Sequence, residues 1–136
     1  MHYDEWEITV PASLKADLLW KVQAYRLAAF LCHCVDEDTR VLSTDSRYVH
    51  TTAQLCRAAG SIVANTAEAY SRRSVRDRVR FYEYALGSAA EAKTWYLGMR
   101  SSLDASTLDT RLALLQSITR LLLKMLSSSR PAPPRA

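Results

Sequence analysis

The absence of proline between residues 13 and 128 is the strongest constraint on the fold of this chain. Pro11 precedes that stretch, and the other three prolines lie within the last six residues. A β protein with many turns commonly uses proline and glycine at them, and the whole chain contains only three glycines. Long helices exclude proline from their interior, because it lacks the backbone N–H and clashes with the preceding turn. We therefore predict an all-α protein.

Apolar side chains recur at three- and four-residue steps in four segments, which is the pattern of amphipathic helices. The predicted helices run from about Leu14 to Val35, Ser46 to Ser71, Val75 to Ser101 and Thr107 to Ser127. Short connections between helices favour antiparallel neighbours. The predicted architecture is an antiparallel up-down four-helix bundle.

The predicted bundle occupies residues 13–128. Residues 1–12 form an N-terminal lead-in that ends near Pro11, and its sequence is compatible with an extended segment that packs Trp6 and Ile8 onto a neighbour. Residues 129–136 form a Pro-rich tail, which is predicted to be disordered.

The last predicted helix is apolar almost all round, which is typical of a helix buried on more than one side. In a small four-helix monomer only one side faces the core, so the other side is predicted to form a subunit interface. A membrane-surface role is the weaker alternative, because Lys124 and arginines lie among the leucines. The apolar positions are Leu112, Leu114, Leu115, Ile118, Leu121, Leu122, Leu123, Met125 and Leu126.

The chain is mildly basic, with 18 Lys and Arg against 14 Asp and Glu, a net charge of +4 and a pI near 9.1. This charge permits attraction to nucleic acid or to an acidic protein but does not require it. No signal peptide and no apolar run approaching the ~20 residues of a membrane span is present. We expect a cytoplasmic protein with no membrane partner.

Three cysteines without regular spacing argue against a disulfide framework. Cys32 and Cys34 flank His33, but residues two apart on a helix point in different directions and cannot chelate one ion together. We interpret Cys32, Cys34 and Cys56 as inert thiols.

Five arginines lie at the junction of the second and third predicted helices: Arg72, Arg73, Arg76, Arg78 and Arg80. Asp77 is the one acidic residue among them. Ser74 and Asp77 have the spacing of a capping box, which would begin a helix at Val75. Cations at a helix N-terminus oppose its dipole, which favours a non-structural reason for them, and phosphate contacts would give salt-sensitive nucleic-acid binding. The alternative is a solvated face whose arginines pair with Glu68, Glu83 or acids of a neighbouring subunit.

A second polar set lies among small side chains: Arg57, Asn65, Glu68, Ser88 and Glu91. A half-buried carboxylate requires a partner, so we predict a structural polar network that fixes helix register and could cross a subunit boundary. Di-metal bundles use Glu-x-x-His, which is absent here, and the three histidines lie far from these carboxylates in sequence. No metal or cofactor is predicted.

The aromatic side chains of Tyr82, Tyr84, Trp95 and Tyr96 could stack nucleobases, although aromatics at helical spacing more often belong to a core or an interface. The sequence contains no G-x-S-x-G motif, no Ser-x-x-Lys motif and no Gly-rich phosphate loop. We predict no catalytic residues and a protein that is not an enzyme.

The segment from Gln54 to Glu91 resembles a family of small four-helix bundle proteins encoded by intervening sequences in bacterial 23S ribosomal RNA genes. That family is similar to the accessory proteins of diversity-generating retroelements. Two positions depart from its pattern, with Val63 in place of proline and Ala69 in place of glycine. The matching positions are Gln54, Arg57, Ala58, Ala59, Ser61, Ile62, Ala64, Asn65, Ala67, Glu68, Tyr70, Arg72, Arg73, Ser74, Phe81, Ala85, Gly87, Ser88 and Glu91.

The resemblance implies a ring-like homopentamer with a basic surface that binds nucleic acid. In the retroelement branch it implies a reverse transcriptase as partner and RNA or DNA as ligand, whereas the function of the ribosomal branch is generally unknown. The predicted function is a non-catalytic oligomeric bundle that binds nucleic acid through its arginines and acts as an accessory to a reverse transcriptase. The alternative is a protein-interaction or scaffold bundle with no direct nucleic-acid binding.

Overall fold

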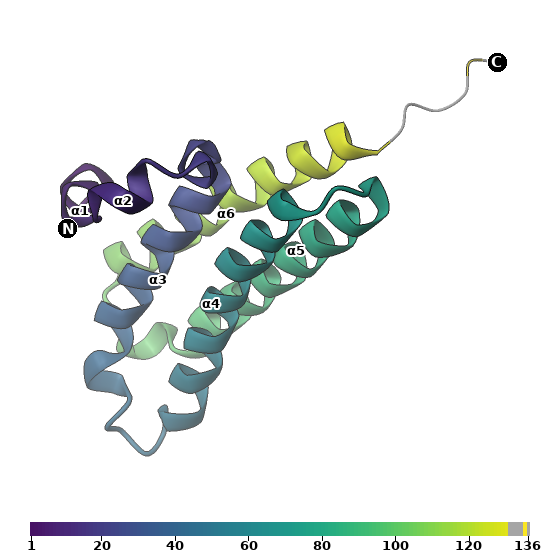
Figure 1. The fold of residues 1–136 in the computed structure, drawn as a ribbon. Helices are drawn as coiled ribbons and strands as arrows, with labels where there is room; N and C mark the ends of the chain where they lie inside the picture. Colours follow the sequence, from purple (N-terminus) through teal and green to yellow (C-terminus); the bar gives the residue numbers. More distant parts are fainter. Residues whose placement is uncertain (131–134, 136) are drawn as a thin grey trace.

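The computed structural model of the chain describes residues 1–130 and residue 135, and every secondary-structure element in that part is helical (Figure 1). The predicted all-α class is therefore confirmed. The elements are α1 (Tyr3–Thr9), α2 (Ala12–Lys15), the 3-10 helix η1 (Leu18–Lys21), α3 (Gln23–Leu42), α4 (Val49–Ser71), α5 (Val75–Gly98), the 3-10 helix η2 (Arg100–Ser102) and α6 (Ala105–Ser129).

The four long helices pack around one another, with α3 against α4, α4 against α5, α5 against α6 and α6 against α3. The α3–α4 and α5–α6 connections lie at one end of the molecule, where the Tyr48 hydroxyl accepts a 2.7 Å hydrogen bond from Ser102 (Figure 1). The α4–α5 connection and the end of α6 lie at the other, where Arg130 bonds Glu83 at 2.8 Å. This packing is compatible with the predicted antiparallel four-helix bundle.

The main core lies between the inward faces of these four helices. Small buried side chains, such as Ala58 of α4 and Ala85, Ala89 and Ala92 of α5, let the α4 and α5 backbones approach closely. Large aliphatic side chains fill the remaining space, each stabilising the fold by about 1.5–3 kcal/mol through burial. The fully buried aliphatic residues include Leu31, Val35, Leu55, Ile62, Leu115, Ile118 and Leu122.

The second, third and fourth predicted helices correspond to α4, α5 and α6, and their ends differ from the prediction by at most three residues. The first predicted helix, residues 14–35, is wrong at both ends. The Asp17 side chain accepts a 2.9 Å hydrogen bond from the backbone N–H of Leu19, and such local bonds compete with a continuous helix. At the other end α3 continues to Leu42, through the acidic residues 36–38 that follow the predicted end at Val35.

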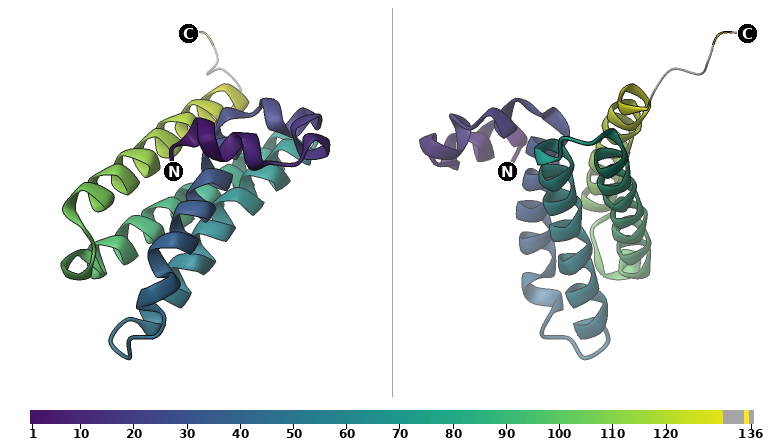
Figure 2. Two further views of the ribbon diagram at one scale, coloured as in Figure 1. Left: turned by 90° about the vertical axis from the view of Figure 1, so that its left-hand side faces the viewer. Right: turned by 45° about the vertical axis from the view of Figure 1, so that its right-hand side comes forward.

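The N-terminal lead-in is helical over α1 rather than extended. Trp6 packs against Trp20 and Phe30, with ring centroids 6.0 and 5.4 Å away. In Figure 2 the N-terminal helices lie beside the beginning of α3, away from α5. Ile8 is 80% exposed and does not contribute to this packing. The same cluster reaches Leu114 of α6, so part of the additional apolar side of α6 is covered within the chain.

The predicted disordered tail, residues 129–136, lies mostly outside the described residues, which omit 131–134 and 136. Its first residue, Ser129, is the last residue of α6. Among the residues described, no helix is both long and apolar enough to cross a membrane.

Candidate nucleic-acid interface

The candidate site is the connection between α4 and α5 with the first turns of α5, here called the arginine turn (residues 72–80). Helix α4 ends because Arg72 adopts extended backbone angles, with φ −79° and ψ 139°. Ser74 then caps α5, since its hydroxyl accepts a 3.0 Å hydrogen bond from the backbone N–H of Asp77. The predicted start of α5 at Val75 is confirmed.

Arg78 holds the arginine turn together. Its Nη1 donates hydrogen bonds to the backbone carbonyls of Arg73 at 2.9 Å and Arg72 at 3.3 Å. Carbonyls beyond a helix end have no partner within the helix, and this guanidinium supplies one. Arg78 is therefore mainly a structural residue, rather than one of five equivalent surface cations.

Arg72 and Arg80 lie on Phe81, with guanidinium carbons 5.1 and 5.0 Å from the ring centroid. Both distances are within the range of cation–π attraction. Arg72 also pairs with Glu68 at 2.5 Å, and Arg80 contacts Asp77 at 3.5 Å. Each of these two arginines is therefore partly neutralised by an acid and also contacts the Phe81 ring.

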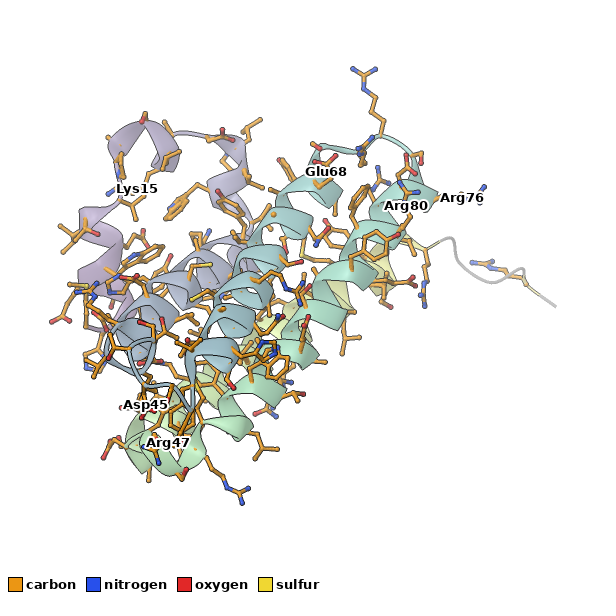
Figure 3. All side chains as sticks on the ribbon, turned by 90° about the horizontal axis from the view of Figure 1, so that it is seen from below. Lys15, Asp45, Arg47, Glu68, Arg76 and Arg80 are labelled. Atoms are coloured by element: carbon orange, nitrogen blue, oxygen red, sulfur yellow. The ribbon has the colours of Figure 1, made fainter. Side chains whose placement is uncertain are left out.

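Arg73 and Arg76 differ from the others, because both are exposed and neither has a side-chain partner in the described part of the chain. Arg76 and Arg80 lie on α5 at the same end of the molecule, with Glu68 on the adjacent end of α4 (Figure 3). Arg130, which directly follows α6 and pairs with Glu83, adds a sixth arginine there. Six arginines and three carboxylates leave a local excess of three positive charges, out of a net +4 for the chain.

The predicted polar network is divided into separate contacts along the outer side of α4 and α5. Arg57 pairs with Glu91 at 2.5 Å, and its side chain remains 60% exposed. Ser61, which was not predicted to take part, accepts hydrogen bonds from Asn65 at 2.9 Å and from Ser88 at 2.8 Å. Glu68 joins neither group, because it pairs with Arg72. The contacts link α4 and α5, and they range from exposed at Arg57 to buried at Ser88.

The aromatic candidates are not equivalent. Tyr82 and Tyr96 are buried in the core. Trp95 is half-buried and donates a 3.4 Å hydrogen bond to Glu91. Tyr84 is 53% exposed, so of the four predicted aromatics it alone presents a largely free ring to a ligand.

A buried ionic cluster was missed by the sequence analysis. Arg111 of α6 donates from Nε and Nη2 to the two carboxylate oxygens of Asp38, at 2.8 and 3.0 Å, and the hydroxyl of Tyr96 donates to Asp38 at 2.7 Å. Burial, with Asp38 alongside, raises the pKa of Tyr96, and the bond to Asp38 raises the pKa of Arg111. The available signal was that Arg111 lies four residues before buried Leu115, on the inward stripe of α6. This cluster joins α3, α5 and α6 and is structural.

The thiols of Cys32 and Cys34 are not activated as nucleophiles. Burial raises the pKa of the Cys32 and Cys34 thiols to about 11, so both are protonated at neutral pH. Among the side chains that the structure describes, no group of three or more His, Cys, Asp or Glu could hold a metal ion.

These features define a small helical protein with a basic turn at one end. The model of the 23S rRNA-intervening sequence protein family matches residues 21–128, so the chain belongs to that family. A similar solved structure is the 1.70 Å crystal structure of a protein of unknown function from the S23 ribosomal protein family of Bacteroides thetaiotaomicron VPI-5482.

That structure superposes with a TM-score of 0.70 at 20% identity, over 76% of this chain and 97% of the other, and at this identity the likeness concerns the fold. No curated protein matches the chain. The predicted membership of the 23S rRNA intervening-sequence family is confirmed. The relationship to retroelement accessory proteins, the pentamer and the reverse-transcriptase partner stay predictions.

Proposed function

We propose that this protein is a non-catalytic helical bundle that binds nucleic acid through contacts between its phosphates and the arginine turn. The observation that supports the proposal is the contrast among its arginines. Arg78 fixes the turn, and Arg73 and Arg76 extend from it without a described acidic partner. Guanidinium groups bind phosphate through paired hydrogen bonds and cannot be deprotonated in proteins.

The local backbone adds to this attraction. Arg73 and Arg76 flank the N-terminus of α5, where the first N–H groups have no partner within the helix and the helix dipole is positive. A helix N-terminus attracts phosphate for both reasons. Placing cations there weakens the helix slightly but strengthens the local positive potential, as expected for a surface that serves an anionic ligand.

Oligomerisation would multiply this site. We propose an up-down bundle that assembles into a homo-oligomer, with a pentamer as the family expectation, so that the arginine turn repeats around a ring. Each added phosphate contact steepens the dependence of affinity on salt. An accessory role beside a reverse transcriptase is compatible with such a ring and remains part of the proposal.

The experiment compares wild type with the Arg73→Glu/Arg76→Glu variant, using fluorescence anisotropy with labelled RNA and DNA at roughly 50–200 mM salt. The matched control is Arg100→Glu/Arg120→Glu, which has the same charge change at two exposed arginines outside the turn. Loss of two phosphate contacts should reduce the slope of log affinity against log salt by about 1.4–1.8, since each contact contributes ~0.7–0.9. The oligomer mass should be unchanged in both variants.

A scaffold role is the second candidate, favoured by the pairing of Arg72 with Glu68 and of Arg80 with Asp77. Those ion pairs reduce the charge available to phosphate. Absence of binding by the intact wild-type oligomer at low salt would contradict the nucleic-acid proposal. It would direct attention to a protein partner instead.

A further inference from the structure

One face of α5 continues the arginine turn and ends in an exposed aromatic ring. Arg76, Arg80 and Tyr84 are spaced four residues apart, so they lie one above another on the helix surface. Eight residues of helix place Tyr84 about 12 Å from Arg76 along the axis. The face therefore has phosphate-binding groups at one end and an aromatic ring at the other.

The ring of Tyr84 has a defined support. It meets Phe81 edge to face, with centroids 5.7 Å apart and planes at 86°. The guanidinium groups of Arg72 and Arg80 in turn both lie over the Phe81 ring, 5.1 and 5.0 Å from its centroid. Edge-to-face contacts of this kind restrict ring orientation, so Tyr84 is held as a platform although it is 53% exposed.

We infer that Tyr84 and the arginine turn form one binding surface for single-stranded nucleic acid, in which an unpaired base stacks on Tyr84 while Arg73 and Arg76 hold neighbouring phosphates. This inference rests on the proposed function and specifies its ligand. Bases within a duplex are already stacked on each other, whereas those of a single strand are free to stack on aromatic side chains. Every base has a flat face, so the surface would bind with little sequence preference.

Charge selects this occupant over an apolar segment of another protein. An apolar segment would gain little from the arginines next to Tyr84, whereas a single strand places a negative phosphate beside each base. The two occupants also differ in what they require of residue 84. Leucine preserves apolar contact but not stacking, and phenylalanine preserves both.

The test measures binding of fluorescein-labelled 20-nucleotide single strands, RNA and DNA, by anisotropy at fixed salt. An abasic strand and a duplex of the same length serve as comparison ligands. The protein is the full chain as wild type, Tyr84→Ala, Tyr84→Leu and Tyr84→Phe. The control is Leu97→Ala, which removes another half-exposed apolar side chain from α5, away from the arginine turn.

Loss of one stacked base should weaken single-strand binding by about 5- to 150-fold in Tyr84→Ala and Tyr84→Leu. Tyr84→Phe and the Leu97→Ala control should stay within about twofold of wild type. The salt slope should be unchanged, because no charge is removed. The abasic strand and the duplex should bind wild type and Tyr84→Ala equally.

Failure of this inference can be separated from failure of the proposed function. If wild type binds and Arg73→Glu/Arg76→Glu abolishes binding, but Tyr84→Ala binds single strands as wild type does, the phosphate site stands and the stacking surface is refuted. Retention of affinity in Tyr84→Leu but not Tyr84→Ala would also overturn stacking. If wild type binds none of the ligands at low salt, both proposals fail.

Discussion

Replacing Arg111 with methionine is the sharpest test of what stabilises this fold. The change removes the guanidinium that bonds both oxygens of Asp38, while keeping an unbranched apolar stem. The side chains of Arg111 and Asp38 are only 13% and 6% exposed. Removing one member of a buried ion pair costs about 3–5 kcal/mol, because the other charge is left buried. Tyr96 remains as a single neutral donor to Asp38.

This loss converts to a large shift in melting temperature. For 136 residues, an unfolding entropy of ~2.1 cal/mol/K per residue gives about 0.29 kcal/mol/K. A loss of 3–5 kcal/mol therefore lowers the Tm by about 10–17 °C. The assay is thermal unfolding followed by circular dichroism, at one protein concentration, since oligomerisation would make the Tm concentration-dependent.

Two further variants show whether the buried charge is the cause. Arg120→Met makes the same chemical change at an exposed position of α6, and should stay within about 0.5 kcal/mol of wild type. The triple variant Asp38→Leu/Tyr96→Phe/Arg111→Met removes every polar member of the cluster, and should recover most of the lost stability. A Tm for Arg111→Met within about 3 °C of the Arg120→Met control would refute the reasoning.

Three further predictions concern the same helices. Gly60→Ala and Gly87→Ala should each stabilise the protein by about 0.5–1 kcal/mol in urea unfolding, because an added Cβ meets nothing within 4 Å. A loss of stability in either variant would contradict this and would indicate that a partner packs at that site. Ser74→Ala should cost about 1 kcal/mol by the same assay through loss of the α5 cap, and Ser74→Gly only a few tenths. Burial raises the pKa of Tyr96 above its ordinary 10.0, so above pH 10 the unfolded state loses this proton first and stability falls. In Tyr96→Phe the fall between pH 10 and 11 should be shallower, by up to ~1.4 kcal/mol per pH unit; equal slopes for both proteins would contradict that assignment.

Most of the fold could be predicted from the sequence because, over α4, α5 and α6, the helix signals in the sequence agree with the faces that the helices bury. Each has a helical apolar period, and Ser74 marks where α5 begins. The N-terminal third was mispredicted because side-chain contacts decide it. Asp17 interrupts the predicted first helix with a local hydrogen bond. In the sequence, the acidic residues 36–38 suggest the end of a helix. In the structure α3 continues through them, and Asp38 is paired with Arg111 across the core.

The position of the candidate site was predictable, but the roles of its residues were not. Arginines this close in sequence at a helix junction must lie near each other. Their roles depend on partners that sequence spacing does not reveal. Arg78 bonds backbone carbonyls, and Arg72 and Arg80 rest on Phe81. These folded contacts distinguish the three arginines from Arg73 and Arg76.

The acids at the arginine turn illustrate why net charge is a poor guide to such a site. Glu68 and Asp77 reduce the positive potential, which taken alone argues against phosphate binding. They also hold Arg72 and Arg80 close to Phe81, whose ring supports Tyr84. Preorganised groups lose less entropy when a ligand binds. The ion pairs therefore lower the long-range attraction of the turn but increase the order of the surface next to it, which suits a ligand held by a few defined contacts.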